Sequence, residues 1–174
     1  EITSRCNLRC VHCYFPKEGD QACDATQELG YEEICSILDQ VVDAGCLWLL
    51  LTGGEPFVRS DALDIYTYAK RKGLLVTLFT NGTLITPDIA DYLAEWRPFL
   101  VEITLYGMSR QTYERVTGVE GSYERCIRGI ELLLDRGIPL KLKTMLMTLN
   151  RHELRDMEAY AEELGVGFRF DPMI

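Results

Sequence analysis

The sequence has few histidines, an excess of acidic over basic residues and no long hydrophobic run. It contains two histidines among 174 residues and carries a formal net charge of -9 at pH 7. A negative field over a whole domain repels phosphate, which argues against a nucleic-acid-binding surface. The longest apolar run, residues 44–51, is far shorter than the roughly 20 residues of a membrane-spanning helix. No signal peptide is visible, so we expect no membrane partner and a cytoplasmic location.

Seven cysteines are present, and an odd number does not suit a framework of disulfides. Cys35, Cys46 and Cys126 lie in segments with a periodic apolar pattern, so we expect them to be small core residues. Cys23 lies in a polar stretch and is expected to be a free thiol. This usage favours a reducing compartment.

Short apolar runs alternate with amphipathic segments along the chain. The runs expected to form strands are residues 46–52, 74–80, 99–106, 139–148 and 166–170, with residues 1–3 as the end of a further strand. The segments expected to form helices are residues 31–45, 60–73, 86–96, 122–137 and 150–165. Repeated βα units without a linker predict right-handed crossovers and a parallel sheet.

Capping signals mark the starts of three of these helices, and Ser60 is the expected N-cap of residues 60–73. Thr86 precedes Pro87, which suits an N-cap followed by proline at the first helical position. Asn150 and Glu153 have the spacing of a capping box.

Polar or glycine-rich sequence follows nearly every predicted strand, at residues 52–56, 80–82, 105–107 and 170–172. A doubly wound sheet gathers its ligand residues at one switch point, whereas a barrel gathers them from many strand ends. The spread of polar strand ends favours the barrel. Six strands are too few for closure at eight, so the expected fold is α/β, a partial (β/α)6 TIM-like barrel with parallel strands.

Three cysteines lie within eight positions near the start of the chain. Three residues separate Cys6 from Cys10, and two separate Cys10 from Cys13. A redox pair at Cys10 and Cys13 would leave Cys6 unexplained. A structural zinc site usually needs four ligands, and the adjacent His12 is badly placed to be the fourth. A cubane cluster held by three thiolates would keep one iron open for a substrate or cofactor.

The spacing C-x3-C-x2-C, followed one βα unit later by Gly53, Gly54, Glu55 and Pro56, resembles the radical S-adenosylmethionine (radical SAM) enzymes. The resemblance covers essentially the whole chain. It implies that Cys6, Cys10 and Cys13 ligate a 4Fe-4S cluster, whose fourth iron binds the amino and carboxylate groups of S-adenosylmethionine. It further implies reductive cleavage of this cofactor to a 5′-deoxyadenosyl radical that abstracts hydrogen from a substrate. A reductant such as flavodoxin or ferredoxin is the implied electron donor.

The glycine pair agrees with this resemblance on physical grounds. Gly53 and Gly54 lack a Cβ, which permits close backbone approach or positive φ, and Pro56 ends the strand ladder. Glu55 supplies a carboxylate that can meet an ammonium, and family members place this segment against the methionine amino group.

Other cofactor contacts are implied more weakly. His12 occupies a position where the family often has an aromatic residue near the adenine, and Thr104 one where it often has a hydroxyl near the ribose. Further candidates at the strand ends or beyond them are Thr80, Asn81, Arg115, Lys141, Lys143, Met173 and Ile174. A strand-end turn explains Thr80 and Asn81 equally well, and a solvated helix surface is the simpler explanation of Arg115. Lys141 and Lys143 share one face of their predicted strand. One of the two is expected to bind an anionic group if that face is inward, and both are solvated between helices if it is outward.

Residues 102–144 most resemble members with a cysteine-rich C-terminal SPASM extension, which act on peptides, sulfatases, tetrapyrroles or other small cofactors. We therefore interpret residues 1–174 as one radical SAM core domain, a fragment of a longer protein, acting on a peptide or small molecule. The alternative is a non-catalytic iron–sulfur or zinc-binding regulatory or structural module. Such a module has no use for the glycine pair and Glu55.

Overall fold

Five parallel strands form one sheet in the computed structural model, which describes residues 1–15 and 28–172. Each strand pairs with the next one along the chain. The strands are β1 (Trp48–Leu51), β2 (Leu75–Thr80), β3 (Leu100–Thr104), β4 (Leu140–Leu146) and β5 (Gly167–Pro172). Sequential parallel pairing is what repeated right-handed βαβ units produce.

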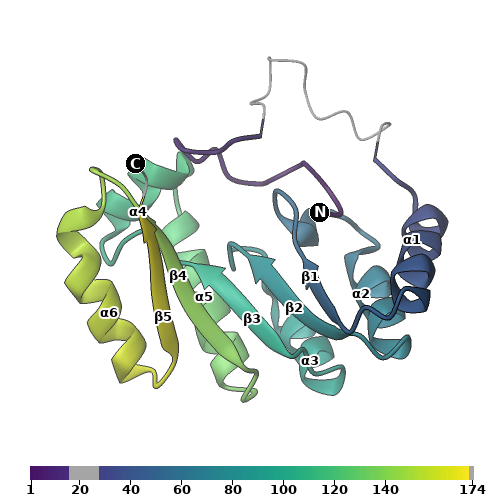
Figure 1. Cartoon of the computed structure of the whole chain (residues 1–174). Helices are drawn as coiled ribbons and strands as arrows, with labels where there is room; N and C mark the ends of the chain where they lie inside the picture. Colours follow the sequence, from purple (N-terminus) through teal and green to yellow (C-terminus); the bar gives the residue numbers. More distant parts are fainter. Residues whose placement is uncertain (16–27, 173–174) are drawn as a thin grey trace.

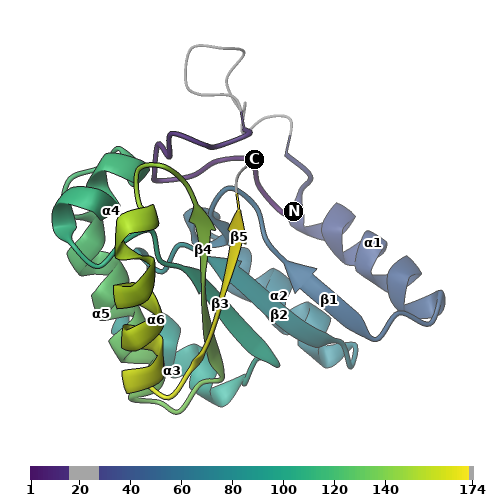
Figure 2. The same ribbon diagram turned by 60° about the vertical axis from the view of Figure 1, so that its left-hand side comes forward.

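The helices pack on one face of this sheet, as two views show (Figures 1 and 2). They are α1 (Tyr31–Asp43), α2 (Ala62–Arg71), α3 (Pro87–Glu95), α4 (Arg110–Thr117), α5 (Ser122–Leu134) and α6 (Leu154–Glu163), with 3-10 turns η2 (Pro56–Val58) and η3 (Arg151–Glu153). No helix of the described segments covers the opposite face. The sheet is therefore an open, partial barrel whose inner face remains accessible.

The core lies between the sheet and the helices. In β2, Val76 and Leu78 are fully buried, while the alternating Thr77 and Phe79 are only partly buried. A strand turns successive side chains to opposite faces, so the second pair lines the open inner face. Thr104 is the register partner of Lys143, which brings the carboxyl ends of β3 and β4 to one level.

The α/β class and the parallel sheet are confirmed. Residues 1–3 are not a strand: Ile2 N–H donates to Thr52 O at 2.8 Å, and Thr3 O accepts from Gly54 N–H. This segment follows the turn after β1 rather than the strand itself, so it has too few pairings for a ladder. Helix α4 was not among the expected elements.

Two cysteine predictions are confirmed and one is wrong. Cys35 and Cys126 are buried, but Cys46 is exposed. Cys46 lies in the turn between α1 and β1, where its Sγ donates to Trp48 O at 3.1 Å. The apolar run 46–52 therefore begins outside the core. Cys23 lies outside the described residues.

One of the three predicted caps forms. Helix α2 begins at Ala62 with Asp61 in the N-cap position, so the Ser60 cap is wrong. The Thr86 hydroxyl accepts from Ile89 N–H at 3.2 Å, and Pro87 begins α3. The capping box is wrong, because Asn150 makes no side-chain cap and the Glu153 carboxylate binds the start of α4 instead. A helix start with several free N–H groups offers that carboxylate more donors than its own turn does.

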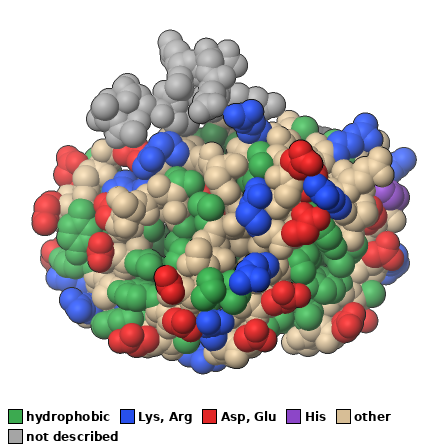
Figure 3. Space-filling view, turned by 180° about the vertical axis from the view of Figure 1, so that it is seen from behind, with side chains coloured by type: hydrophobic (Ala, Val, Ile, Leu, Met, Phe, Trp, Pro, Cys, Tyr) green, Lys and Arg blue, Asp and Glu red, His purple; other side chains and the backbone are tan. Residues whose placement is uncertain are grey.

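The helix-covered side of the molecule carries both signs of charge. Figure 3, seen from behind, shows Lys and Arg interspersed with Asp and Glu among hydrophobic side chains. Among the residues that the structure describes, no helix combines the length and apolar character needed to cross a membrane.

Candidate functional site

The cysteine-bearing segment crosses the carboxyl ends of the strands (Figure 1). At one end, Thr3 O accepts from Gly54 N–H at 2.8 Å, and Arg5 O accepts from Glu55 N–H at 2.9 Å. At the other end, Arg9 N–H donates to Thr117 O at 2.8 Å, at the close of α4. The segment is thus fixed at both ends over the open mouth of the sheet.

The glycine pair serves this docking directly. A Cβ on Gly53 would lie 2.5 Å from Thr3 O, and one on Gly54 would lie 2.3 Å from Arg5 O. Neither glycine has positive φ. The close backbone approach expected for this motif is therefore made by the cysteine-bearing segment.

Glu55 is fully buried behind this contact. Its carboxylate accepts from the Thr80 hydroxyl at 2.8 and 2.9 Å and from Asn81 N–H at 2.7 Å. Burial raises the pKa of Glu55 to about 7, although these hydrogen bonds oppose the rise. Pro56 is buried and begins η2, for which Glu55 is the N-cap. The turn therefore holds the ends of β1 and β2 together.

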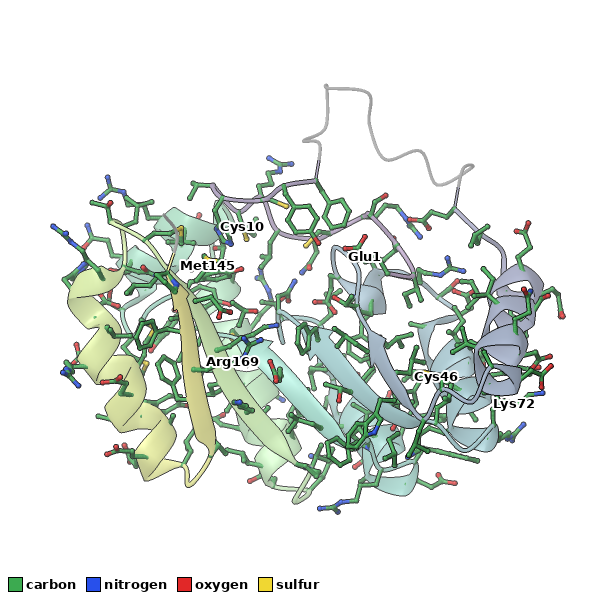
Figure 4. All side chains as sticks on the ribbon, viewed as in Figure 1. Glu1, Cys10, Cys46, Lys72, Met145 and Arg169 are labelled. Carbon is green, nitrogen blue, oxygen red and sulfur yellow. The ribbon has the colours of Figure 1, made fainter. Side chains whose placement is uncertain are left out.

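Cys6, Cys10 and Cys13 line one cavity of about 370 Å³, within the range of small-molecule sites. Figure 4 shows Cys10 above the sheet, near Met145 of β4. Among the described residues, no three Cys, His, Asp or Glu side chains are grouped as ligands of a metal ion. The thiols thus share a cavity without converging on one point, and a multi-iron cluster, unlike one zinc ion, binds each thiolate through a different iron.

Burial raises the pKa of Cys6, and it raises the pKa of Cys10 to about 12, with the neighbouring Cys6 adding to the second effect. Without a metal these thiols hold their protons. Binding of iron replaces the protons, since a thiol coordinated to a metal is deprotonated. The Asn81 amide also lies 3.8 Å from Cys6 Sγ, so the β2 end contacts the sulfur of this cysteine.

His12 lies in the cavity wall beside Tyr106. The Tyr106 hydroxyl and His12 Nε2 are 3.3 Å apart, and the rings meet edge to face at 5.1 Å. His12 Nδ1 is buried and has no hydrogen-bond partner among the described residues, and burial lowers the pKa of His12. A buried polar atom without a partner is unusual, which makes this nitrogen a candidate contact for a bound ligand.

Most of the remaining candidates lie at the same mouth. Thr104, Thr80, Asn81 and Lys143 line the cavity together with Gly53 and Gly54. Lys143, on β4, does face inward, as its contact with the Phe79 ring shows. Arg115 is exposed on α4 and is not part of the lining. Met173 and Ile174 lie outside the described residues.

Tyr106, Phe79, Met145 and Asp171 were not among the predicted site residues, although all four line the cavity. A signal existed for Tyr106, because it stands two positions after Thr104 at the end of a predicted strand. The inward face of each strand could also be inferred from Thr104, since alternate residues share a face.

Comparison with known proteins places this site in a family. Residues 1–164 match the Radical SAM superfamily. An AdoMet-dependent heme synthase of Methanosarcina barkeri is 34% identical over 165 residues, which are 95% of this chain and 46% of that protein. The subtilosin biosynthesis protein AlbA of Bacillus subtilis is 31% identical over 166 residues, 95% of this chain and 36% of that protein. The chain thus spans less than half the length of these relatives.

The fold is shared with solved structures. Streptococcus suis SuiB, bound to the precursor peptide SuiA, superposes with a TM-score of 0.83 at 18% identity. The superposition covers 98% of this chain and 38% of that one. The open sheet and the helices behind it are therefore a recurring architecture.

Proposed function

Because the chain belongs to the radical SAM superfamily, we propose that residues 1–174 form a catalytic core domain that cleaves S-adenosylmethionine reductively to start radical chemistry on a substrate. The observation that carries this proposal is the cavity itself. It gathers Cys6, Cys10 and Cys13 with the glycine turn on which their segment is docked.

The residues present fit the family's 4Fe-4S cluster. Three thiols face one cavity, and the cluster takes thiolate ligands. Cys6, Cys10 and Cys13 would each hold one iron, which leaves the fourth iron for S-adenosylmethionine. When bound and reduced, the cluster supplies the electron that breaks a carbon–sulfur bond of S-adenosylmethionine and yields the 5′-deoxyadenosyl radical.

The residues of the chain bind and orient this pair of cofactors. Gly53 and Gly54 keep the cysteine segment close to the end of β1, and Glu55 fixes the polar ends of β1 and β2. Thr104, at the end of β3, and His12, on the cysteine segment, offer the same cavity a hydroxyl and an unpartnered ring nitrogen. We assign them to the sugar and base of S-adenosylmethionine.

The relatives support a maturation role. One is named for heme synthesis and another for bacteriocin biosynthesis, while SuiB was solved with a precursor peptide. We therefore propose a peptide or a small cofactor precursor as the substrate, a SPASM-type full-length protein, a flavodoxin or ferredoxin as reductant, and a cytoplasmic location.

The test is anaerobic reconstitution of the protein with iron and sulfide, followed by dithionite and S-adenosylmethionine. We expect about four irons per chain and formation of 5′-deoxyadenosine. Cys6→Ala, Cys10→Ala and Cys13→Ala should each abolish the cluster, whereas Cys35→Ala, in the buried core, should keep it. A protein that binds only zinc and gives no 5′-deoxyadenosine would support the non-catalytic module instead.

A further inference from the structure

A chain of charged side chains runs across the inner face of the sheet below the cavity. Arg169 Nη2 and Nε donate to Glu102 Oε2 at 3.1 and 3.3 Å. Arg169 Nη1 donates to Asp171 Oδ2 at 3.0 Å. Figure 4 shows Arg169 on this open face, beneath Met145. Glu102 is buried, so its charge is balanced here chiefly by Arg169.

Lys143 lies at the upper end of this row of charged side chains, and its positive charge is less completely neutralised. Its Nζ lies 3.8 Å from Glu102 Oε2, beyond ordinary hydrogen-bond distance, and 3.0 Å from the centroid of the Phe79 ring. Its side chain is only 14% exposed and lines the cavity that the cysteines share. Burial lowers the pKa of Lys143 to about 8 and Arg169 adds to this, while the carboxylates of Glu102 and Asp171 oppose it. A largely desolvated ammonium whose charge is incompletely neutralised favours the binding of an anionic group.

The Lys143 ammonium lies on the sheet side of the strand ends that are assigned to cofactor binding. Its two contacts, Phe79 and Glu102, come one and two residues before the strand-end residues Thr80 and Thr104. The cysteine segment and Gly54 lie beyond those ends. A ligand that reaches Lys143 therefore extends down the inner face, away from the groups assigned to S-adenosylmethionine.

We propose that Lys143 is a specificity-determining residue whose Nζ pairs with a carboxylate of the substrate, so that the enzyme selects an acid-bearing peptide side chain or cofactor precursor. Glu102 and Arg169 are positioning residues that hold the ammonium at this level. The inference rests on the proposed function, because it takes the shared cavity as the place where substrate meets the cofactors. S-adenosylmethionine also carries a carboxylate, and the test separates the two sources.

The first experiment observes the wild-type holoenzyme by NMR with carbon-13-labelled lysine. The chain has five lysines, and Lys143→Gln assigns the resonance. The probes are N-acetyl-glutamate N-methylamide and its glutamine counterpart, at matched ionic strength. We expect a saturable shift of the Lys143 resonance with the acid and none with the amide. Equal responses to the two probes, or none to either, would overturn the proposal.

The second experiment compares Lys143→Gln with Lys141→Gln, which removes the same charge one level lower on the same strand face and outside the cavity lining. We expect Lys143→Gln to weaken binding of the acid probe at least tenfold and to change the dissociation constant of S-adenosylmethionine by less than twofold. Lys141→Gln should leave the dissociation constants of the acid probe and of S-adenosylmethionine unchanged. A tenfold loss of S-adenosylmethionine affinity in Lys143→Gln would assign the lysine to the cofactor and reject the proposal.

Failure of the proposed function is recognised separately, as absence of 5′-deoxyadenosine from the wild-type holoenzyme, a measurement without the acid probe. If Lys143→Gln does not fold, substitution of the other four lysines assigns the Lys143 resonance by elimination, and its shift in the wild-type holoenzyme decides between binding and no binding.

Discussion

The Glu55 carboxylate links the turn after β1 to the end of β2, and burial makes its negative charge unfavourable. No part of the residue is exposed, and its oxygens accept from Thr80 and Asn81. Burial raises its pKa from 4.5 to about 7. Between these two pH values the folded apoprotein keeps a proton that the unfolded chain has lost. The contribution to stability is therefore complete below pH 4.5 and is lost as the pH rises through 7.

We expect Glu55→Gln to remove this pH dependence. The free energy of unfolding of the apoprotein should fall by roughly 2–3 kcal/mol between pH 4.5 and 7 in the wild type, and this fall should be absent in the variant. Denaturant titrations at several pH values measure it. The difference between the two proteins isolates Glu55 from other groups, such as His12. Identical pH profiles would show that Glu55 is ionised throughout.

Single residues also show what the sequence could and could not predict at the site. Cys6, Cys10 and Cys13 were identified from their spacing, because a short loop brings near neighbours together wherever it lies. The Tyr106–His12 contact joins positions 94 apart, and the contact of Lys143 with Phe79 depends on which strand face is inward. Such contacts depend on the register of the sheet, which single-strand patterns do not determine.

At the scale of elements, the turn after β1 is the dock for the cysteine segment. A Cβ at position 54 would meet the backbone of Arg5, which cannot move aside as a flexible side chain can. Gly54→Ala should therefore displace the segment and reduce cluster incorporation at least threefold, with the far-ultraviolet circular dichroism unchanged. Iron content and absorbance near 410 nm measure the loss.

Gly30→Ala is the matched control, because the nearest atom to its added Cβ is a Glu33 side-chain oxygen at 3.6 Å. It should bind the cluster like the wild type. Full cluster content in Gly54→Ala would show that the segment docks without this close approach.

Helix α4 depends on a carboxylate from another element. The Glu153 carboxylate accepts from Met108 N–H at 2.6 Å, from Ser109 N–H at 3.1 Å and from the hydroxyls of Ser109 and Thr112. Burial opposes its ionisation, but the hydrogen bonds led by those from Ser109 and Thr112 lower its pKa overall. This carboxylate therefore fixes the start of the helix whose end holds the cysteine segment.

Glu153→Gln should lower the free energy of unfolding by roughly 1–3 kcal/mol, because an amide cannot accept from all four donors. Urea denaturation measures the change. Glu162→Gln, on the exposed side of α6, should cost less than about 0.5 kcal/mol. Equal costs at the two positions would contradict the role of Glu153 as a cap.

The sequence predicted the other helices but not α4, for a physical reason. The segment Arg110–Thr117 has few apolar residues, chiefly Tyr113 and Val116, and so gives little periodic signal. Its stability comes from the Ser109 cap, the left-handed Gly118 and Glu153. The last of these is distant in sequence and cannot be read from the local pattern.

At the scale of the molecule, the cysteine segment is a strap between β1 and α4. It makes few hydrogen bonds to either, and Cys6 Sγ adds one long contact, 3.8 Å from the Asn81 amide. Cluster binding should therefore slow amide hydrogen exchange in residues 6–13 by at least tenfold, since a ligand bound only to the folded site suppresses local opening.

Hydrogen exchange with mass spectrometry, with and without the reconstituted cluster, measures this protection. Peptides from β3, which is buried in the centre of the sheet, should exchange at the same rate in both states. Uniform protection of β3 and residues 6–13 would indicate that the cluster stabilises the whole fold instead.

The strap also has a consequence for the order of events during synthesis. Ribosomes release the thiols first, but Arg9 is held by the carbonyl of Thr117, about a hundred residues later in the chain. Until α4 has emerged and packed, the metal-binding loop has no far anchor. Iron and sulfide that reach the nascent chain would thus meet three thiols on a segment without its second anchor. Cluster insertion therefore follows translation of the domain, when the cavity already exists.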